Sequence, residues 1–494
     1  MNGSRRQTHR PLVLAALVVA MFMAAIEATI VATAMPSIVA RLGGLALYSW
    51  VFSAFLLMQA VTTPIYGKLS DLFGRKRVFM TGISVFLLGS LLCGFASSMA
   101  ALVAFRVVQG LGAGAVQPLA VTLIGDLYTI EERGRIQGYI ASVWGTSAIL
   151  GPLAGALIVQ HAHWAWIFWL NVPFGLVAVT LAGLYLHERI ERKKPAVDYA
   201  GAVLLLVFLS ALMLVLTQGA RWGLAGALPL LIVGTIALLL FVRQEREAPD
   251  PIVHLELWKR RMIALANMAT LAGGIAMMGV IGFLPVSIQG VLHASALVAG
   301  FALCAMSLGW PLAAVITGRL LLRVGMRTLA RVGGSAVFAG SLVVALAAGR
   351  DAVAAGAGSF VMGMGFGVLN TTFIVSIQSS VDWSQRGVAT SSNLLMRILG
   401  NAVGAAVFGG VLNLALKHAL GLVAGSAPLG STQNLLESAI AGSGESAAAL
   451  HFGLASALHW VFAIVALFSA AALAASWMMP DHRTPRGAVP ARPG

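Results

Sequence analysis

Glu27 is the one acidic residue that lies deep within an apolar stretch of this sequence, in the run AAIEATIVATAMP. The other sixteen acidic residues fall in polar segments or near the ends of apolar ones. A carboxylate in hydrocarbon is unfavourable by several kcal/mol unless it is protonated, paired or in contact with water, and such a group is a functional candidate by default. We therefore predict that Glu27 binds and releases a proton; the alternative is a purely structural ion pair.

Arg106 is the partner that the sequence offers. Glu27 precedes the expected outer end of its apolar stretch by about nine residues, and Arg106 follows the outer end of another by about six. At 1.5 Å per helical residue, both groups lie ~9 to 13 Å below the outer surface. Arg106 favours the ionised carboxylate and burial favours the neutral one, so a movement that separates the two groups would capture or release one proton.

The elements that position this pair are membrane-spanning helices. The chain is 59% hydrophobic and only 10% charged, with a mean hydropathy of +0.90, which does not suit a water-soluble surface. Fourteen apolar stretches are each long enough to span a bilayer. With both termini in the cytoplasm, 26 of the 32 Lys and Arg residues lie on that side, four lie opposite, and Arg106 and Arg397 lie inside spans. The fold expected is an all-α membrane protein.

An internal repeat divides the chain. Gly67 and Gly74 recur as Gly318 and Gly325, an offset of 251 residues, and two further matches recur at 253: Gly110, Gly112 and Gly114 as Gly363, Gly365 and Gly367, and Arg133-Gly134 as Arg386-Gly387. We predict a six-helix bundle in 1–190, two inserted helices and a cytoplasmic linker in 191–260, a second six-helix bundle in 261–480 and a disordered cytoplasmic tail in 481–494. Asp71 and Arg106 correspond to Leu322 and Ser359, so the charged chemistry belongs to the first half.

A short polar loop, GKLSDLFGRKRV from Gly67 to Val78, separates the second span from the third. Its glycines allow a tight turn, and Asp71 is suited to meet a helix N-terminus or a basic partner. The basic residues hold the loop in the cytoplasm. We expect a cytoplasmic gating loop formed by Gly67, Asp71, Gly74, Arg75, Lys76 and Arg77.

Five motifs make the chain similar to the major facilitator superfamily, and within it to the fourteen-span drug:proton antiporters: the loop above, RVVQGLGAG from Arg106, GTSAILGPLAG from Gly145, and first- and sixth-span signatures from Ile26 and Trp164. The third motif resembles that of exporters and supplies a candidate hinge at Gly145, Gly151, Pro152 and Gly155. Two departures are Glu27, where an aspartate is common, and Ala165, where an arginine is common. No sugar-porter signature is present.

The resemblance implies a proton-coupled exporter of lipophilic and cationic drugs in the bacterial inner membrane. Alternatives are a dedicated exporter of one metabolite or lipid, and a sensor that transports nothing. Small lipophilic compounds, protons and membrane lipids are the expected partners, without nucleic acid, and we expect a monomer with no cofactor, no metal and no enzymatic activity. The candidate cavity residues, chosen by analogy with a two-bundle plan, are Gln59, Met277, Met278, Phe283, Met306, Trp310, Phe366 and Asn370.

Overall fold

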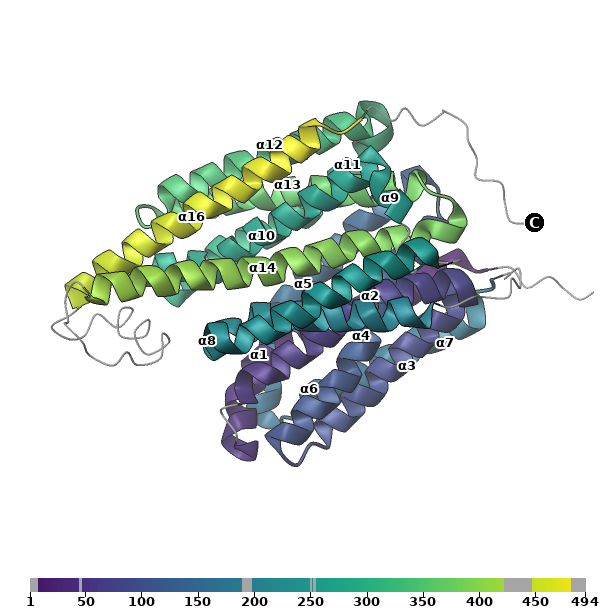
Figure 1. The fold of residues 1–494 in the computed structure, drawn as a ribbon, viewed down its shortest axis with the longest axis horizontal. Helices are drawn as coiled ribbons and strands as arrows, with labels where there is room; N and C mark the ends of the chain where they lie inside the picture. The colour runs from purple at the N-terminus through teal and green to yellow at the C-terminus, as the bar shows by residue number, and fades with distance from the viewer. Residues whose placement is uncertain are drawn as a thin grey trace, which may run out of the picture.

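The computed structural model describes residues 8–43, 47–188, 198–248, 251, 255–421 and 447–480, and these residues are almost entirely helical (Figure 1). Apart from a 3₁₀ turn at Trp383–Gln385, the elements are α1 (Arg10–Leu42), α2 (Tyr48–Phe73), α3 (Arg75–Gly94), α4 (Met99–Leu127), α5 (Ile130–His161), α6 (Trp166–Trp169), α7 (Asn171–Tyr185), α8 (Tyr199–Glu247), α9 (Leu255–Lys259), α10 (Arg261–Gly290), α11 (Ala296–Val324), α12 (Met326–Ala347), α13 (Ala352–Ser379), α14 (Arg386–Gly421) and α16 (Ala447–Trp477). The tail predicted for 481–494 lies outside the described residues.

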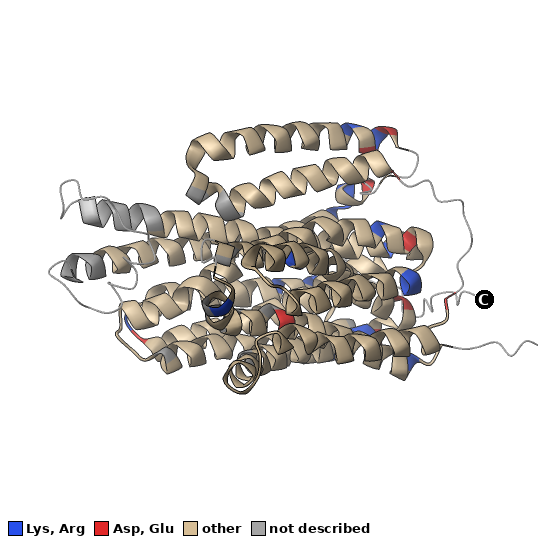
Figure 2. Ribbon diagram, turned by 90° about the horizontal axis from the view of Figure 1, so that it is seen from below, with Lys and Arg blue, Asp and Glu red and all other residues tan. Residues whose placement is uncertain are grey.

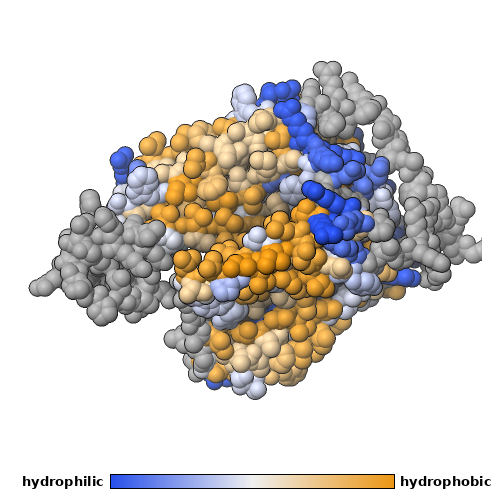
Figure 3. All heavy atoms as spheres, viewed as in Figure 1, coloured by the Kyte–Doolittle hydropathy of each residue, from blue (hydrophilic) through white to orange (hydrophobic). Residues whose placement is uncertain are grey.

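Fourteen segments of these helices are long and apolar enough to cross a membrane, which confirms the predicted number of spans. Large apolar side chains cover a broad belt of the surface, and hydrophilic residues gather towards its ends (Figure 3). The Lys and Arg residues gather mainly at one end of the bundle (Figure 2). That distribution agrees with the cytoplasmic side assigned from the sequence.

Two helices differ in detail from expectation. α1 ends at Leu42, fifteen residues after Glu27, whereas the sequence suggested an end about nine residues after it. The helix therefore extends past Pro36, where the sequence suggested that it would end. The two inserted spans form the single element α8, which is interrupted at Gly223 (φ 67°) and yields spans Tyr199–Leu216 and Trp222–Glu247.

The sequence repeat corresponds to repeated packing. A side chain at Gly110 or Gly114 of α4 would collide with α2, and one at Gly112 would collide with α3. In α13, the equivalent outer glycines face α11 and the middle one faces α12. Because glycine lets helix backbones approach closely, the same three-glycine pattern packs each of these helices between two neighbours.

The first six spans and the last six bury separate apolar cores. Two large clusters of buried side chains lie among α1–α7, and another lies among α10–α16 with a short contribution from α9. The two groups of spans contact one another mainly where α2 meets α14 and where α5 meets α11, while α8 lies against α2 and α14 (Figure 1). Both principal junctions include glycines of the sequence repeat.

Candidate functional site

Glu27 is buried in α1, with 1% of its surface exposed, and its two carboxylate oxygens have different partners. Oε1 accepts a hydrogen bond from Nη1 of Arg106 and forms an ion pair with it. Oε2 accepts a hydrogen bond of 2.6 Å from Nδ2 of Asn171, at the start of α7. The two residues that the sequence paired by depth are therefore in direct contact, and three helices meet at the carboxylate.

Arg106 has further contacts besides the carboxylate of Glu27. Its Nε donates to the carbonyl oxygen of Val51 at 3.0 Å, and Nη1 also donates to Oε1 of Gln109 at 2.7 Å. The guanidinium carbon lies 4.1 Å from the centre of the Phe55 ring, close enough for a cation–π interaction. These contacts come from α2 and from the next turn of α4, so they hold the guanidinium in place independently of Glu27.

Ser90 of α3 completes the network. Its Oγ accepts hydrogen bonds from Nε2 of Gln109 (3.1 Å) and Nδ2 of Asn171 (2.9 Å), and it donates to the carbonyl oxygen of Phe168. The sequence reasoning did not assign Ser90 or Gln109 to the site. Gln109 had a detectable signal, since it lies one helical turn after Arg106 in an apolar run; Ser90 had none.

Asp71 joins the predicted gating loop to the last six spans. Its oxygens accept hydrogen bonds from the backbone N–H groups of Gly387 (3.1 Å) and Val388 (3.0 Å), in the first turn of α14. This turn has unpaired N–H groups and a partial positive charge, which a carboxylate stabilises. A side chain at Gly67 would lie 2.8 Å from the carbonyl oxygen of Gly387, so α2 and α14 nearly touch there.

Arg75, also in this loop, links four elements. It pairs with Asp71 at 3.0 Å and with Asp126 of α4, its Nη2 donates to the carbonyl oxygen of Trp383 at 2.7 Å, and its guanidinium stacks on the Trp383 ring. Asp126 also pairs with Arg386 at 3.0 Å. The result is a buried charge network between the cytoplasmic ends of the two groups of spans.

The remaining residues of the predicted gating loop lie outside this charge network. Gly74 has a φ of 92°, which lets α2 end and α3 begin without an intervening loop, and Gly325 repeats this geometry with a φ of 86°. Lys76 donates from Nζ to the carbonyl oxygen of Gly183 at 2.7 Å, and its backbone N–H is capped by Glu188. Arg77 is exposed.

The candidate hinge lies within α5, which continues as one helix through this segment. A side chain at Gly145 would face α11, with Ser307 O at 3.3 Å, and one at Gly151 would collide with Thr29 of α1. Gly155 is buried, and Pro152 lies in the same helix. The motif therefore packs α5 between α1 and α11, and its role as a hinge stays a prediction.

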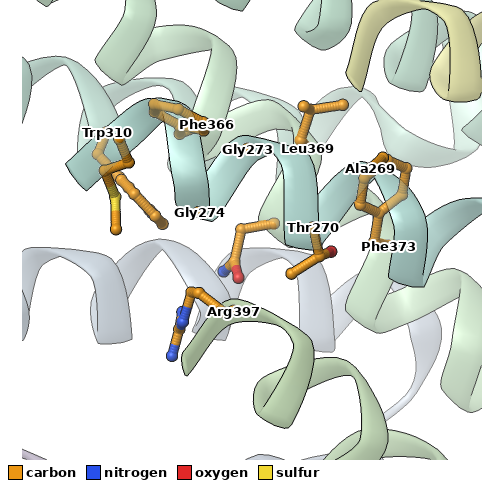
Figure 4. Close-up of a pocket in the computed structure, with 11 residues that line it drawn as sticks. Ala269, Thr270, Gly273, Gly274, Trp310, Phe366, Leu369, Phe373 and Arg397 are labelled. Carbon is orange, nitrogen blue, oxygen red and sulfur yellow. The ribbon is translucent and has the colours of Figure 1, made fainter. Parts of the chain in front are cut away.

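A pocket lies among α10, α11, α13 and α14 (Figure 4). Four of the candidate cavity residues line it: Met277, Trp310, Phe366 and Asn370. The rings of Trp310 and Phe366 stack with centroids 5.7 Å apart. The rest of the lining is Ala269, Thr270, Gly273, Gly274, Leu369, Phe373 and Arg397.

The other four cavity candidates lie elsewhere. Phe283 packs edge-on against Phe408, Met306 is 5% exposed in the core, and neither Gln59 nor Met278 lines the pocket. Arg397 and Thr270 were not predicted to line a cavity. An arginine in the middle of an apolar span was a usable sequence signal for Arg397.

Neither metal nor disulfide chemistry is built into the described ranges. They contain no group of three or more His, Cys, Asp or Glu side chains that could hold a metal ion. Cys93 and Cys304 are both free.

Known proteins match both the sequence and the fold. Residues 17–405 match the sequence profile of the Major Facilitator Superfamily. The multidrug transporter protein MdtP of Bacillus subtilis (strain 168) is 33% identical over 421 residues, which cover 84% of this chain and 77% of MdtP. Multidrug resistance protein 3 of the same strain is 36% identical over 440 residues, or 87% and 86% of the two chains.

Two solved structures share the fold at low sequence identity. The human organic anion transporter MFSD10 (TETRAN) gives a TM-score of 0.62 at 16% identity and covers 93% of this chain and all of its own. The proton:xylose symporter XylE gives 0.58 at 13% identity, with 95% and 96% of the two chains covered. Together with the fourteen spans and the matched motifs, these similarities establish that the chain belongs to the major facilitator superfamily of membrane transporters.

Proposed function

We propose that this protein is a proton-coupled exporter that exchanges protons for lipophilic toxic compounds, cationic drugs among them, across the bacterial cytoplasmic membrane. The observation that carries the proposal is the buried carboxylate of Glu27, bound by Arg106 and Asn171. An ionisable group at this depth, paired with a residue of a different helix, can take up or release a proton when the two helices separate. The substrate breadth is inferred from the two Bacillus relatives, a multidrug transporter and a multidrug resistance protein.

The network has a different set of bonds for each protonation state. When Glu27 is ionised, both oxygens accept hydrogen bonds, as observed. When it is protonated, one oxygen becomes a donor and the attraction to Arg106 weakens. The Oδ1 of Asn171, a buried acceptor without a hydrogen-bond donor in the described structure, is placed to take that proton's hydrogen bond after an amide rotation.

Arg106 keeps its other partners when Glu27 is neutral. Val51 and Gln109 hold the guanidinium on α2 and α4, while Glu27 and Asn171 belong to α1 and α7. Protonation therefore loosens α1 from α4 without freeing an unpaired arginine in the core. We infer that this loosening favours the rearrangement that opens one face of the protein and closes the other.

The described state has its cytoplasmic ends closed. Asp71, Arg75 and Arg386 connect the two groups of spans there, and export requires this connection to open so that substrate can enter from the cytoplasm. An inward proton current then drives the cycle, since one charge crossing 100 mV provides about 2.3 kcal/mol. We propose that the protein works as a monomer and needs no cofactor.

Efflux in everted vesicles tests the proposal. A panel of lipophilic cations, neutral compounds and acids is supplied with and without an uncoupler, for wild type and for Glu27→Gln. We expect Glu27→Gln to abolish uphill transport, while Glu27→Asp, which keeps the titratable group, retains part of it. Undiminished uphill transport by Glu27→Gln would overturn proton coupling through this residue. Transport of a single panel member would instead indicate a dedicated exporter.

A further inference from the structure

Arg397 lies in the middle of a membrane span. The span runs from Trp383 to Leu412, so Arg397 is fourteen residues from one end and fifteen from the other. At 1.5 Å per residue this is ~20 Å from either end, too far for the side chain to extend to the membrane surface. A charge at this depth needs a carboxylate, a polar cavity or a ligand.

Arg397 has no such carboxylate. Its guanidinium forms neither an ion pair nor a hydrogen bond with any side chain or backbone group in the ranges that the structure describes. The sequence explains why, because Glu27 is the sole acidic residue deep within a span and it is occupied by Arg106 and Asn171. The two mid-span arginines therefore differ: one is fully paired, and the other is not.

The pocket supplies Arg397 with neighbours that donate hydrogen bonds. Thr270 accepts a bond of 3.0 Å from Asn393 at its Oγ1, which leaves its own hydroxyl hydrogen available. The Asn370 amide has no hydrogen-bond partner among the described residues. A guanidinium, an amide and a hydroxyl can all donate to one anion, and no carboxylate lines the pocket to compete with it.

The rest of the pocket is apolar and aromatic. Trp310 and Phe366 form a stacked pair at one margin, and Figure 4 shows Arg397 at another, on α14. Gly273 faces Phe366, where an added side-chain carbon would lie 3.2 Å from the ring. The glycine thus keeps space beside the aromatic wall. A ligand that matches both margins has an acidic group and an apolar, preferably aromatic, body.

We propose that this pocket binds amphipathic organic acids, with the anionic group on Arg397 and the apolar body against Trp310 and Phe366. The inference rests on the proposed function and narrows its substrates. A lipophilic cation is repelled by an unpaired guanidinium, so cations would have to occupy a different part of the transport path. A proton that moves inward and an anion that moves outward each make the inside more positive by one charge. The exchange is therefore electrogenic.

Binding of three probes with one common ring system provides the test. The probes are 2-naphthoate, 2-naphthamide and 2-naphthylmethylammonium, titrated calorimetrically into full-length protein in nanodiscs. We expect wild type to bind the carboxylate at least tenfold more tightly than the amide, and the ammonium most weakly. Arg397→Gln should weaken carboxylate binding at least tenfold and change amide binding less than twofold. Arg397→Lys keeps the charge without the paired donors, so it should retain an intermediate preference.

Arg350→Gln is the matched control, because it removes an exposed arginine that does not line the pocket. It should leave all three affinities unchanged. Equal binding of the carboxylate and the amide by wild type would overturn the proposal, as would equal loss of both in Arg397→Gln. If Arg397→Gln does not fold, a wild-type-like order of affinities in Arg397→Lys supports the proposal and loss of the order contradicts it.

Transport in proteoliposomes separates this inference from the proposed function. Glu27-dependent uptake of 2-naphthoate with a measurable current supports both. Glu27-dependent transport of the panel without a preference for the carboxylate overturns the anion site alone. A carboxylate preference in binding, with no dependence of transport on Glu27 or on the proton gradient, overturns proton coupling and leaves the anion site standing.

Discussion

Two junctions at the cytoplasmic ends have the same backbone geometry and different chemistry. Where α2 meets α14, a side chain at Gly67 would lie 2.8 Å from Gly387 O. Where α5 meets α11, a side chain at Gly318 would lie 2.1 Å from Gly134 O. Gly318 and Gly387 are the repeat copies of Gly67 and Gly134, so the duplication produced two matched glycine contacts.

Among the described residues, only one of these junctions has ion pairs. Asp71 caps α14, and ion pairs of Arg75 and Arg386 with Asp126 surround that contact. Among the described residues, no ion pair or hydrogen bond joins α5 to α11. The α2–α14 junction can therefore be opened by a change of charge, whereas the α5–α11 junction is held by close packing.

The largest effect is expected at the α5–α11 junction, where no ion pair joins the described residues of the two helices. Gly318→Leu places side-chain atoms against the backbone of Gly134, which cannot move aside, at a cost of about 3 kcal/mol to the closed state. Transport should fall about 100-fold, as measured by efflux in everted vesicles. Gly300→Leu on the same helix has no atom near the new side chain and should transport normally. Normal transport by Gly318→Leu would show that α5 and α11 need not approach this closely.

Asp71→Asn should have the next largest effect. The amide keeps the shape but loses the charge that stabilises the α14 N-terminus, worth about 1–2 kcal/mol, so transport should fall about tenfold. In a background without Cys93 and Cys304, Ser391→Cys beside Gly67 should react faster with an impermeant maleimide from the cytoplasmic side. Asp351→Asn, at the exposed N-cap of α13, is the matched control. Unchanged reactivity would mean that Asp71 does not hold this junction closed.

A smaller change is expected for Gly67→Ala. Its methyl group would meet Ser391 Oγ at 2.2 Å and Gly387 O at 2.8 Å. A shift of the two helices costs about 1 kcal/mol, which should lower efflux about fivefold. Ser391→Gly removes the nearest obstacle and should restore part of the activity in the double variant. If Ser391→Gly gives no rescue, the loss does not arise from this contact.

The smallest effect is expected for Gly145→Ala, further along α5. The new methyl group would lie 3.3 Å from Ser307 O, so a slight adjustment accommodates it. Efflux should stay within twofold of wild type. A much larger loss would show that the segment from Gly145 to Gly155 bends during the cycle, which would support the hinge predicted from the sequence.

The sequence predicted much of the fold because the membrane acts on each segment separately. A run of about twenty apolar residues is favourable in lipid whatever its neighbours are, and Lys and Arg mark its cytoplasmic end. The same solvent argument marked Glu27 and Arg106 as exceptional. The glycine spacing also revealed the repeat, since each copy had to fit the same neighbouring helices.

What the sequence could not supply were contacts that depend on helix rotation and register. Ser90 and Asn171 are ordinary polar residues until α3 and α7 turn them towards Glu27. Met306 and Phe283 are on the expected helices but do not line the pocket.

The number of spans, their orientation and the buried carboxylate were thus determined by the sequence alone, through the free energy of placing each side chain in hydrocarbon. Only the tertiary structure decided that Arg397 lines a pocket without an acidic partner, and that Gly67 meets Gly387 while Gly318 meets Gly134. Such pairings join residues hundreds of positions apart, and packing of whole helices, not local preference, selects them.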